Sequence, residues 1–410
     1  MKSNSTGIYK FIGIHSFLIG LFPFYLPVYL WKTGTSFSGI SFFIALTGLG
    51  FCITLWVWDR LRRNITLKRF VLISFILEIL LLAVVFLDKT PFAFLIFGLL
   101  NGAYNGLFWT TQRVLFFDTI QPSNSGKKFG NLQIIVALFL KSGIFLGGLT
   151  LDTLGFNSLF LFSTIIAGLG ALSFFFSRQS ASHSPELVQI KPTRLADILR
   201  FKDTHHSKPV FLLDGLFLYL ESYFWMISMF LIVKESFWDL GLLVIGLMVL
   251  FTILFFIIKN SIDRLPKTLF FRFSILLYAT SWWLRGSIDG DQSLVSLFVA
   301  LVLISFFTSL FRLTFNKRFF DIAKSELRYH YLIQKSYYSQ ASIAIVFAVI
   351  GIITLNLNDP TTALQSIYFL AVFLTAGYFV YSVKMTGKTR LDSLSHDMTK
   401  TGKSSGKSMV

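Results

Sequence analysis

Residues 107–118, LFWTTQRVLFFD, recur as residues 310–321, LFRLTFNKRFFD, and this repeat decides how the chain is organised. Six of the twelve positions are identical, at an offset of 203 residues in a chain of 410. The apolar matches carry little weight in a sequence with 49 Phe residues, so the signal rests on the shared Thr and on Asp118 with Asp321. We therefore expect two structurally equivalent halves.

A shorter match supports this repeat. The pair Asp59-Arg60 recurs as Asp263-Arg264 at an offset of 204, and a Leu follows in both places. Both members of the pair come directly after a long apolar run, as equivalent positions in two halves should.

The composition predicts that the chain lies in a lipid bilayer. Charged residues make up 14% of the chain and hydrophobic residues 54%, whereas a soluble domain has about 25% charged residues. Runs long enough to cross a hydrocarbon core about 30 Å thick lie near 11–31, 37–58, 70–88, 91–117, 130–151, 156–177, 210–233, 240–259, 269–288, 294–320, 329–356 and 362–383. Because backbone polar groups in lipid must be satisfied internally, each run should be a helix. The expected fold class is an all-α membrane protein with about twelve transmembrane helices in two parallel-repeat six-helix halves.

Polar segments divide these runs into four parts. We expect a six-helix half over 1–177, a cytoplasmic linker over 178–208 and a second half over 209–384. The Lys-, Ser- and Gly-rich residues 385–410 have little to bury, so a disordered cytoplasmic tail is expected there.

The positive charge indicates the orientation of the chain. With the N-terminus in the cytoplasm, 29 of the 37 Lys and Arg fall in inner segments. The outer connections then carry only Lys32, Lys89, Lys234 and Arg285. This asymmetry follows the positive-inside rule and predicts a multi-pass protein, with both termini cytoplasmic, in a bacterial cytoplasmic (inner) membrane. The net charge of +17 is therefore an orientation signal, with membrane lipids rather than nucleic acid as partners, and we expect a monomer.

Several chemistries are not supported by the sequence. Cys52 is the single cysteine, so a disulfide or a cysteine metal site is excluded. His205 and His206 lack helical ligand spacing and are interpreted as a solvated pair. No Ser/His/Asp set or phosphate loop is found, so we expect neither an enzyme nor a bound metal or cofactor.

Three short motifs resemble those of the major facilitator superfamily. Residues 59–63, DRLRR, are similar to its Asp-Arg-x-Gly-Arg loop, with Arg62 in place of the glycine, and 263–267, DRLPK, is a weaker copy. Residues 143–155 resemble the glycine-rich motif of the family's antiporters, with Ile144 where a proline is usual. The resemblance implies that spans 1, 4, 7 and 10 line a central cavity and that spans 3, 6, 9 and 12 are peripheral.

Charged residues inside the apolar runs are the candidate functional groups. A charge at a helix centre costs about 2.5–3.5 kcal/mol on insertion scales, so such residues usually face a cavity or one another. They are Glu78, Arg113, Lys141, Asp214, Glu221, Arg312 and Lys335. All except Glu78 fall on spans that the resemblance places at or beside the cavity, and Glu78 is interpreted as a packing residue.

Lys141 and Glu221 lie near the middle of their spans, where a substrate site is expected. In the functional interpretation Lys141 holds an anionic group, while Glu221 takes a proton or a cationic group, and Asp214 is a second candidate for the proton. Arg113 and Arg312 then extend a positive path to the cytoplasm. The alternative is that these charges only neutralise each other.

Span four carries a polar stripe. Asn101, Asn105, Trp109 and Gln112 share one helical face, and Tyr104 lies alongside. The stripe either forms a cavity wall that binds the substrate or makes hydrogen bonds between helices.

His15 in span one leaves a similar choice. Its charge can change near neutral pH, so it either relays protons or is an ordinary interior histidine.

Acidic residues at the cytoplasmic ends of spans suggest an inner gate. Contacts of these carboxylates with basic loops form only when the inner ends close. The proposed gate residues are Asp59, Arg60, Asp118, Asp263, Arg264 and Asp321.

The function expected from these features is secondary active transport of a small solute by alternating access. Basic residues outnumber acidic ones in the expected cavity, which favours proton-coupled transport of an anionic or zwitterionic metabolite. The aromatic content and the partial glycine motif leave an exporter of lipophilic or cationic compounds as the alternative. A lipid flippase or scramblase is a more remote one.

Overall fold

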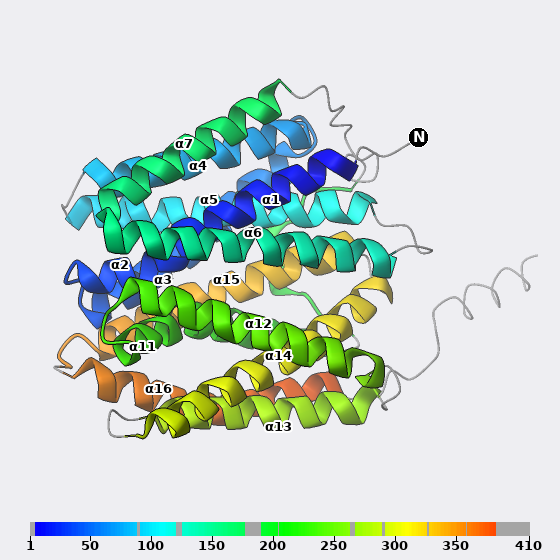
Figure 1. Cartoon of the computed structure of the whole chain (residues 1–410). Coiled ribbons are helices and arrows are strands. Elements are labelled where there is room, and N and C mark those ends of the chain that lie inside the picture. The colour runs from blue at the N-terminus through cyan, green and yellow to red at the C-terminus, as the bar shows by residue number, and fades with distance from the viewer. Residues whose placement is uncertain are drawn as a thin grey trace, which may run out of the picture.

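The computed structural model describes residues 5–87, 91–119, 125–176, 190–203, 205–262, 267–288, 292–325, 328–357 and 359–382. The helices run side by side in one bundle (Figure 1). The first half comprises α1 (Ser5–Leu21), η1 (Pro23–Tyr25), α2 (Leu26–Lys32), α3 (Phe37–Leu61), α4 (Leu67–Leu87), α5 (Pro91–Thr119), α6 (Ser125–Thr153) and α7 (Gly155–Phe175). After α9 (Leu195–Leu199), the second half comprises α10 (Ser207–Tyr219), η2 (Leu220–Phe224), α11 (Trp225–Ile232), α12 (Phe237–Ile262), α13 (Lys267–Gly286), α14 (Leu294–Ser325), α15 (Arg328–Ile353), α16 (Pro360–Leu374) and η3 (Thr375–Ser382).

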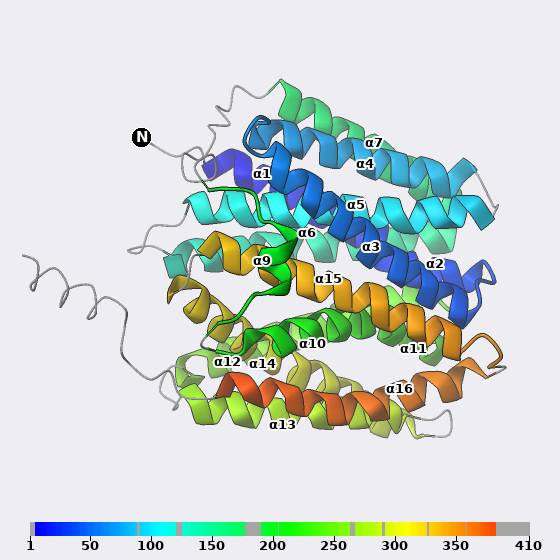
Figure 2. The same cartoon turned by 180° about the vertical axis from the view of Figure 1, so that it is seen from behind.

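These helices form twelve crossing segments in the described part of the chain, one at each expected apolar run. Both α1 and α10 begin at the end of the bundle where α9 lies, which we call the linker end (Figure 2). The two halves are therefore parallel repeats, and the predicted fold class is confirmed. Residues 385–410 and the DRLP part of 263–267 lie outside the described residues.

The first span of each half is interrupted. In the first half, Pro23 and Pro27 remove backbone donors, and the helix passes through the 3-10 turn η1 before continuing as α2. In the second half, the interruption is the π-helix η2, which contains Glu221. A π-helical turn inside an α-helix is frequent at functional sites.

The surface of the bundle is that of a protein in lipid. Seven helical stretches of the described residues are each long and apolar enough to cross a membrane. Large apolar side chains such as Leu161, Phe176, Leu294 and Phe373 are exposed on the outside of the bundle. In water such a surface would aggregate, whereas acyl chains cover it without cost.

Glycines allow helices of the first half to approach closely. A Cβ on Gly102 of α5 would lie 2.1 Å from the carbonyl oxygen of Thr47 on α3. A Cβ on Gly143 of α6 would lie 2.1 Å from the carbonyl oxygen of Phe17 on α1. The first glycine of the 143–155 motif thus serves close packing of α6 on α1.

The two halves meet along α3 and α15, which run in opposite directions. At the linker end, the Tyr329 hydroxyl donates to Asp59 over 2.6 Å. Midway, Gly48 lies directly against the backbone of α15. At the other end, the Ser38 hydroxyl donates to the carbonyl of Gly351 over 2.7 Å. The halves are therefore in contact at both ends of this pair.

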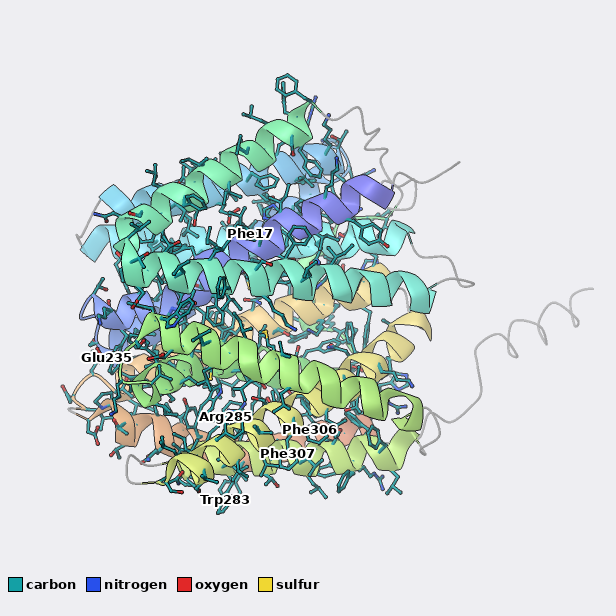
Figure 3. The ribbon with its side chains drawn as sticks, in the orientation of Figure 1. Phe17, Glu235, Trp283, Arg285, Phe306 and Phe307 are labelled. Carbon is teal, nitrogen blue, oxygen red and sulfur yellow. The ribbon has the colours of Figure 1, made fainter. Side chains whose placement is uncertain are left out.

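Arg285 was expected to lie in an outer connection, but the structure places it inside the bundle. It occupies the last turn of α13 and is 3% exposed, and Figure 3 shows it inside the second half. Its guanidinium donates to Ser281 and Thr308, both over 2.9 Å, and lies 4.4 Å from the ring of Trp282. Hydroxyl acceptors and the aromatic face allow the charge to be buried.

Candidate functional site

Ionic side chains meet between α10, α14 and α15. Asp214 on α10 accepts two charged partners, with Oδ1 2.6 Å from Arg312 Nη1 and Oδ2 2.6 Å from Lys335 Nζ. Arg312 on α14 also reaches Glu221, with Nη2 3.0 Å from Oε2. One arginine therefore joins two carboxylates of the seventh span, and the four residues form a continuous network.

The π-helix η2 carries the second carboxylate of this network. Glu221 accepts a hydrogen bond from the Tyr278 hydroxyl in addition to its contacts with Arg312. The Tyr278 ring is stacked on Phe311 with centroids 4.1 Å apart, which fixes the position of its hydroxyl. The carboxylate is thus held by groups on α13 and α14.

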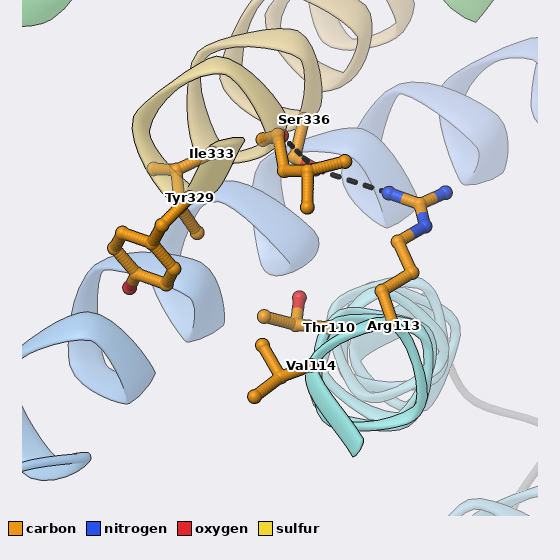
Figure 4. A pocket seen from close by; sticks show the side chains of 7 residues that line it. Thr110, Arg113, Val114, Tyr329, Ile333 and Ser336 are labelled. Atoms are coloured by element: carbon orange, nitrogen blue, oxygen red, sulfur yellow. Dashed lines mark hydrogen bonds between the residues drawn. The ribbon is translucent and has the colours of Figure 1, made fainter. Parts of the chain in front are cut away.

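Arg113 adds a further cation from the first half. Its Nη1 donates to Ser336 Oγ on α15 over 3.2 Å, and it interacts electrostatically with Asp214 and Lys335. Figure 4 shows it at the edge of a small pocket between α5 and α15. The pocket is lined by Thr110, Arg113, Val114, Tyr329, Leu332, Ile333 and Ser336. The network therefore spans the two halves and contains three cations and two carboxylates.

The polar stripe of α5 is a chain of hydrogen bonds. Trp109 Nε1 donates to Asn105 Oδ1 over 3.2 Å, and Asn105 Nδ2 donates to the carbonyl of Asn101 over 2.8 Å. Asn101 Nδ2 lies 3.1 Å from Thr47 Oγ1 and 3.3 Å from the Tyr223 hydroxyl. Because Tyr223 belongs to η2, the stripe ends beside the second half, next to the segment that carries Glu221.

Two further predicted site residues are Tyr104 and Lys141. Tyr104 is 1% exposed, and its hydroxyl is 3.4 Å from His15 Nδ1, inside the first half. Lys141 lies half-buried on α6, while the Glu221 carboxylate is engaged by Arg312 and Tyr278. The structure thus brings Glu221 to Arg312.

Asp59 is the centre of the contacts at the linker end. Its fully buried carboxylate accepts from Arg62 Nε over 2.8 Å, from the Thr193 amide over 2.7 Å and from Tyr329. Arg62 Nη2 in turn donates to the carbonyl of Ile190 over 2.9 Å. This one carboxylate therefore connects α3 with the linker and with α15.

The other predicted gate residues are placed differently. Arg60 is exposed, and its guanidinium lies 3.6 Å from the ring of Trp56 on the same helix. The side chains of Asp118 and Asp321, and the whole of Asp263 and Arg264, lie outside the described residues.

Some site residues were not singled out from the sequence. Tyr223, Tyr278, Tyr329 and Ser336 each donate to or accept from a predicted residue. Tyrosines and serines are common in membrane helices, and no spacing in the sequence separates these four from the rest. Arg62 was noted only as a departure from the family motif.

Comparison with known proteins agrees with this architecture. The family model of the Major Facilitator Superfamily matches residues 11–330. The uncharacterized MFS-type transporter YitZ of Bacillus subtilis (strain 168) is 27% identical over 153 residues, which are 37% of this chain and 92% of YitZ.

Solved structures share the fold. Crystal structures of the nucleoside transporter NupG and of a mutant of it align with a TM-score of 0.67 and 13% identity. Each alignment covers 92% of this chain and 99% of the NupG chain. With twelve crossing helices in two parallel halves and a family match over most of its length, this chain belongs to the major facilitator superfamily of membrane transporters.

Proposed function

We propose that the protein is a proton-coupled secondary transporter that moves a small organic anion or zwitterion by alternating access. The observation that carries this proposal is the excess of largely buried positive charge in the network of the second half, to which the first half adds Arg113. Among the described residues, Arg113, Arg312 and Lys335 share two carboxylates, Asp214 and Glu221. An uncompensated charge away from water is costly, so an anionic group of a solute would be stabilised there.

Arg312 is the proposed anchor for that anionic group. A guanidinium binds a carboxylate through two parallel N–H groups, and Arg312 already presents its Nη2 and Nε to Glu221. A bound solute carboxylate would compete with Glu221 for these donors. The displaced Glu221 would then lose its counter-charge and take up a proton, which couples the two events. Asp214, the second carboxylate of the network, is the other proposed proton acceptor.

The rest of the solute would contact the stripe on α5. Asn105 and Trp109 are partly exposed, and they offer an amide and an indole ring on the same helical face as Arg113. Such groups bind hydroxyl, amine or ring substituents. Lys141, half-buried on α6, is proposed as a further cation for the anionic end.

A thermal-shift screen of the purified protein tests this proposal. The probes are succinate, glutamate, uridine and tetraphenylphosphonium, which are an anion, a zwitterion, a neutral nucleoside and a lipophilic cation. A ligand at 100 times its Kd stabilises the folded state by about 2.7 kcal/mol, so we expect succinate or glutamate to raise the unfolding temperature by several degrees.

Arg312→Gln should remove this shift, because it deletes the proposed anchor. A shift caused by tetraphenylphosphonium alone would support the exporter of cationic compounds. A shift caused by uridine alone would show that the excess positive charge does not select the solute.

A further inference from the structure

The first half encloses a second group of ionisable side chains, away from the network of Arg312. Glu78 on α4, His15 on α1 and Tyr104 on α5 are 2%, 0% and 1% exposed. His15 Nδ1 lies 3.6 Å from Glu78 Oε2 and 3.4 Å from the Tyr104 hydroxyl. Glu78 was expected from the sequence to be a packing residue, and the structure places it beside a histidine.

Aromatic rings close this cluster off from water. The His15 ring is stacked on Phe75 with centroids 4.1 Å apart, and Phe108 lies 4.4 Å away. Phe11 packs edge-on against His15 at 4.7 Å and also touches Phe174 on α7. In the described part of the chain, the ionisable side chains that meet in this cluster are Glu78, His15 and Tyr104, and the phenylalanine rings around them are apolar.

The hydrogen bonds identify the atom of His15 that can change its protonation. Ser74 Oγ lies 3.2 Å from His15 Nε2, and the same hydroxyl donates its hydrogen to the carbonyl of Val71 over 2.7 Å. A hydroxyl has one hydrogen, so Ser74 can only accept from the ring, and Nε2 carries a proton. The change of charge therefore takes place at Nδ1, the nitrogen that faces Glu78 and Tyr104.

We infer that Glu78, His15 and Tyr104 form an occluded proton-binding site in the first half of the protein. Glu78 Oε2 is a buried oxygen without a hydrogen-bond partner, and it lies 3.6 Å from His15 Nδ1. One proton shared by the pair leaves it neutral overall, either as carboxylate with imidazolium or as carboxylic acid with imidazole. Removing that proton leaves a bare carboxylate in an apolar cage, and adding another leaves a bare cation.

The corresponding spans of the two halves hold related clusters that differ in their base. In the second half, the seventh, ninth and tenth spans bring together Glu221, Tyr278 and Arg312. The first, third and fourth spans bring together a histidine, a glutamate and a tyrosine. Both halves thus assemble a carboxylate, a base and a tyrosine, but arginine is permanently charged, whereas histidine is not.

The use of this proton in transport rests on the proposed function. The cage is formed by α1, α4, α5 and α7, so water reaches the pair only when these helices move apart. A proton bound on one side of the membrane would then be carried in the closed cage and released on the other side. This second proton site would act beside the one proposed at Glu221.

The pH dependence of thermal unfolding tests the site with protons as the only ligand. Purified full-length wild type, Glu78→Gln and His15→Gln are unfolded in detergent between pH 4.5 and 9. In the folded wild type the pair keeps one proton, whereas in the unfolded chain it holds none above about pH 6.5. The folded state therefore becomes less stable as the pH rises above that value. The equilibrium constant for folding falls about tenfold for each pH unit.

Glu78→Gln should abolish this fall, because a buried neutral His15 beside an amide keeps no extra proton. Asp239→Asn removes an exposed carboxylate at the start of α12 and serves as the matched control, with a curve parallel to wild type. Parallel curves for wild type and Glu78→Gln between pH 7 and 9 would overturn the inference.

His15→Gln provides a second test if Glu78→Gln does not fold. The lone buried carboxyl would keep its proton while the unfolded Glu78 loses it at about pH 4.3. The fall in stability should then begin about two pH units lower than in wild type, and an unchanged onset would also overturn the inference. No solute is added in this experiment, so a negative result in the solute screen does not affect it. In the same way, a negative result here does not affect the solute screen.

Discussion

The guanidinium of Arg312 lies 2.6 Å from the carboxylate of Asp214, and this contact joins α14 to the broken seventh span. The same guanidinium reaches Glu221 on the π-helical turn seven residues later. A solute that recruits Arg312 therefore acts both on α10 and on the π-helical turn that follows it. Recognition of an anion and movement of the seventh span would be connected through one side chain.

Replacing Arg312 by Gln should destabilise the protein. Removal of one partner from a buried ion pair costs about 3–5 kcal/mol, and the side chain of Arg312 is 20% exposed, so we expect the lower end of that range. Thermal unfolding in detergent gives the effect. Arg312→Lys should be intermediate, because an ammonium keeps the charge but not the two-pronged contact. Equal stability of Arg312→Gln and wild type would show that Asp214 and Glu221 do not need this partner.

Glu221→Gln should uncouple transport from protons. The amide can still accept from Tyr278, so the fold should persist, but it cannot take up the proton that the displaced carboxylate needs. Exchange of labelled solute across liposomes should remain, while accumulation driven by a pH gradient should fall at least tenfold. Wild-type accumulation by Glu221→Gln would refute the coupling role and leave a structural ion pair.

Asp59→Asn should open the linker end of the bundle. The change removes charged hydrogen bonds from Arg62, Thr193 and Tyr329, and a hydrogen bond to a charged group contributes about 1.5–3 kcal/mol. Loss of one such bond would shift the ratio of open to closed molecules by about 10- to 100-fold. Distances between spin labels at positions 69 and 272, in a Cys52→Ser background, should lengthen.

Two variants sharpen this gate experiment. Tyr329→Phe deletes only the hydrogen bond across the halves, so it should produce a smaller shift in the same direction. Arg60→Gln removes an exposed cation that lies on the ring of Trp56, so the label distances should not change. An increase in distance as large as that in Asp59→Asn would place Arg60 within the gate. Unchanged label distances in Asp59→Asn would remove Asp59 from the gate.

Gly102→Ala should weaken the packing of α5 on α3. The added methyl group would meet the carbonyl oxygen of Thr47 at 2.1 Å, so the helices must separate. Overpacking of this kind typically costs about 1–3 kcal/mol. Gly168→Ala on α7 is the matched control, because its Cβ would meet nothing within 4 Å and alanine is the better helix former. Thermal unfolding should separate the two, and equal stability would contradict the close-packing assignment.

The helices and their arrangement in two halves were predictable from the sequence. Runs of about 20 apolar residues leave the backbone one structure in lipid, the α-helix. The Asp and Thr matches at an offset of 203 indicated the repeat, and the spacing of Asn101, Asn105 and Trp109 indicated a polar stripe along one face of α5. These features depend on the order of residues along one helix, so the linear pattern is sufficient to find them.

Contacts between helices were decided by the tertiary structure. Glu221 meets Arg312, Tyr104 turns toward His15, and Arg285 lies among indole rings instead of in a loop. Which side chains meet depends on how far each helix is rotated about its axis and how closely its neighbour approaches. Packing at sites such as Gly102 sets both quantities, and residues distant in sequence determine that packing. The sequence by itself therefore identified the charges that interrupt the apolar runs, and only the packed bundle determined their partners and the burial of Arg285.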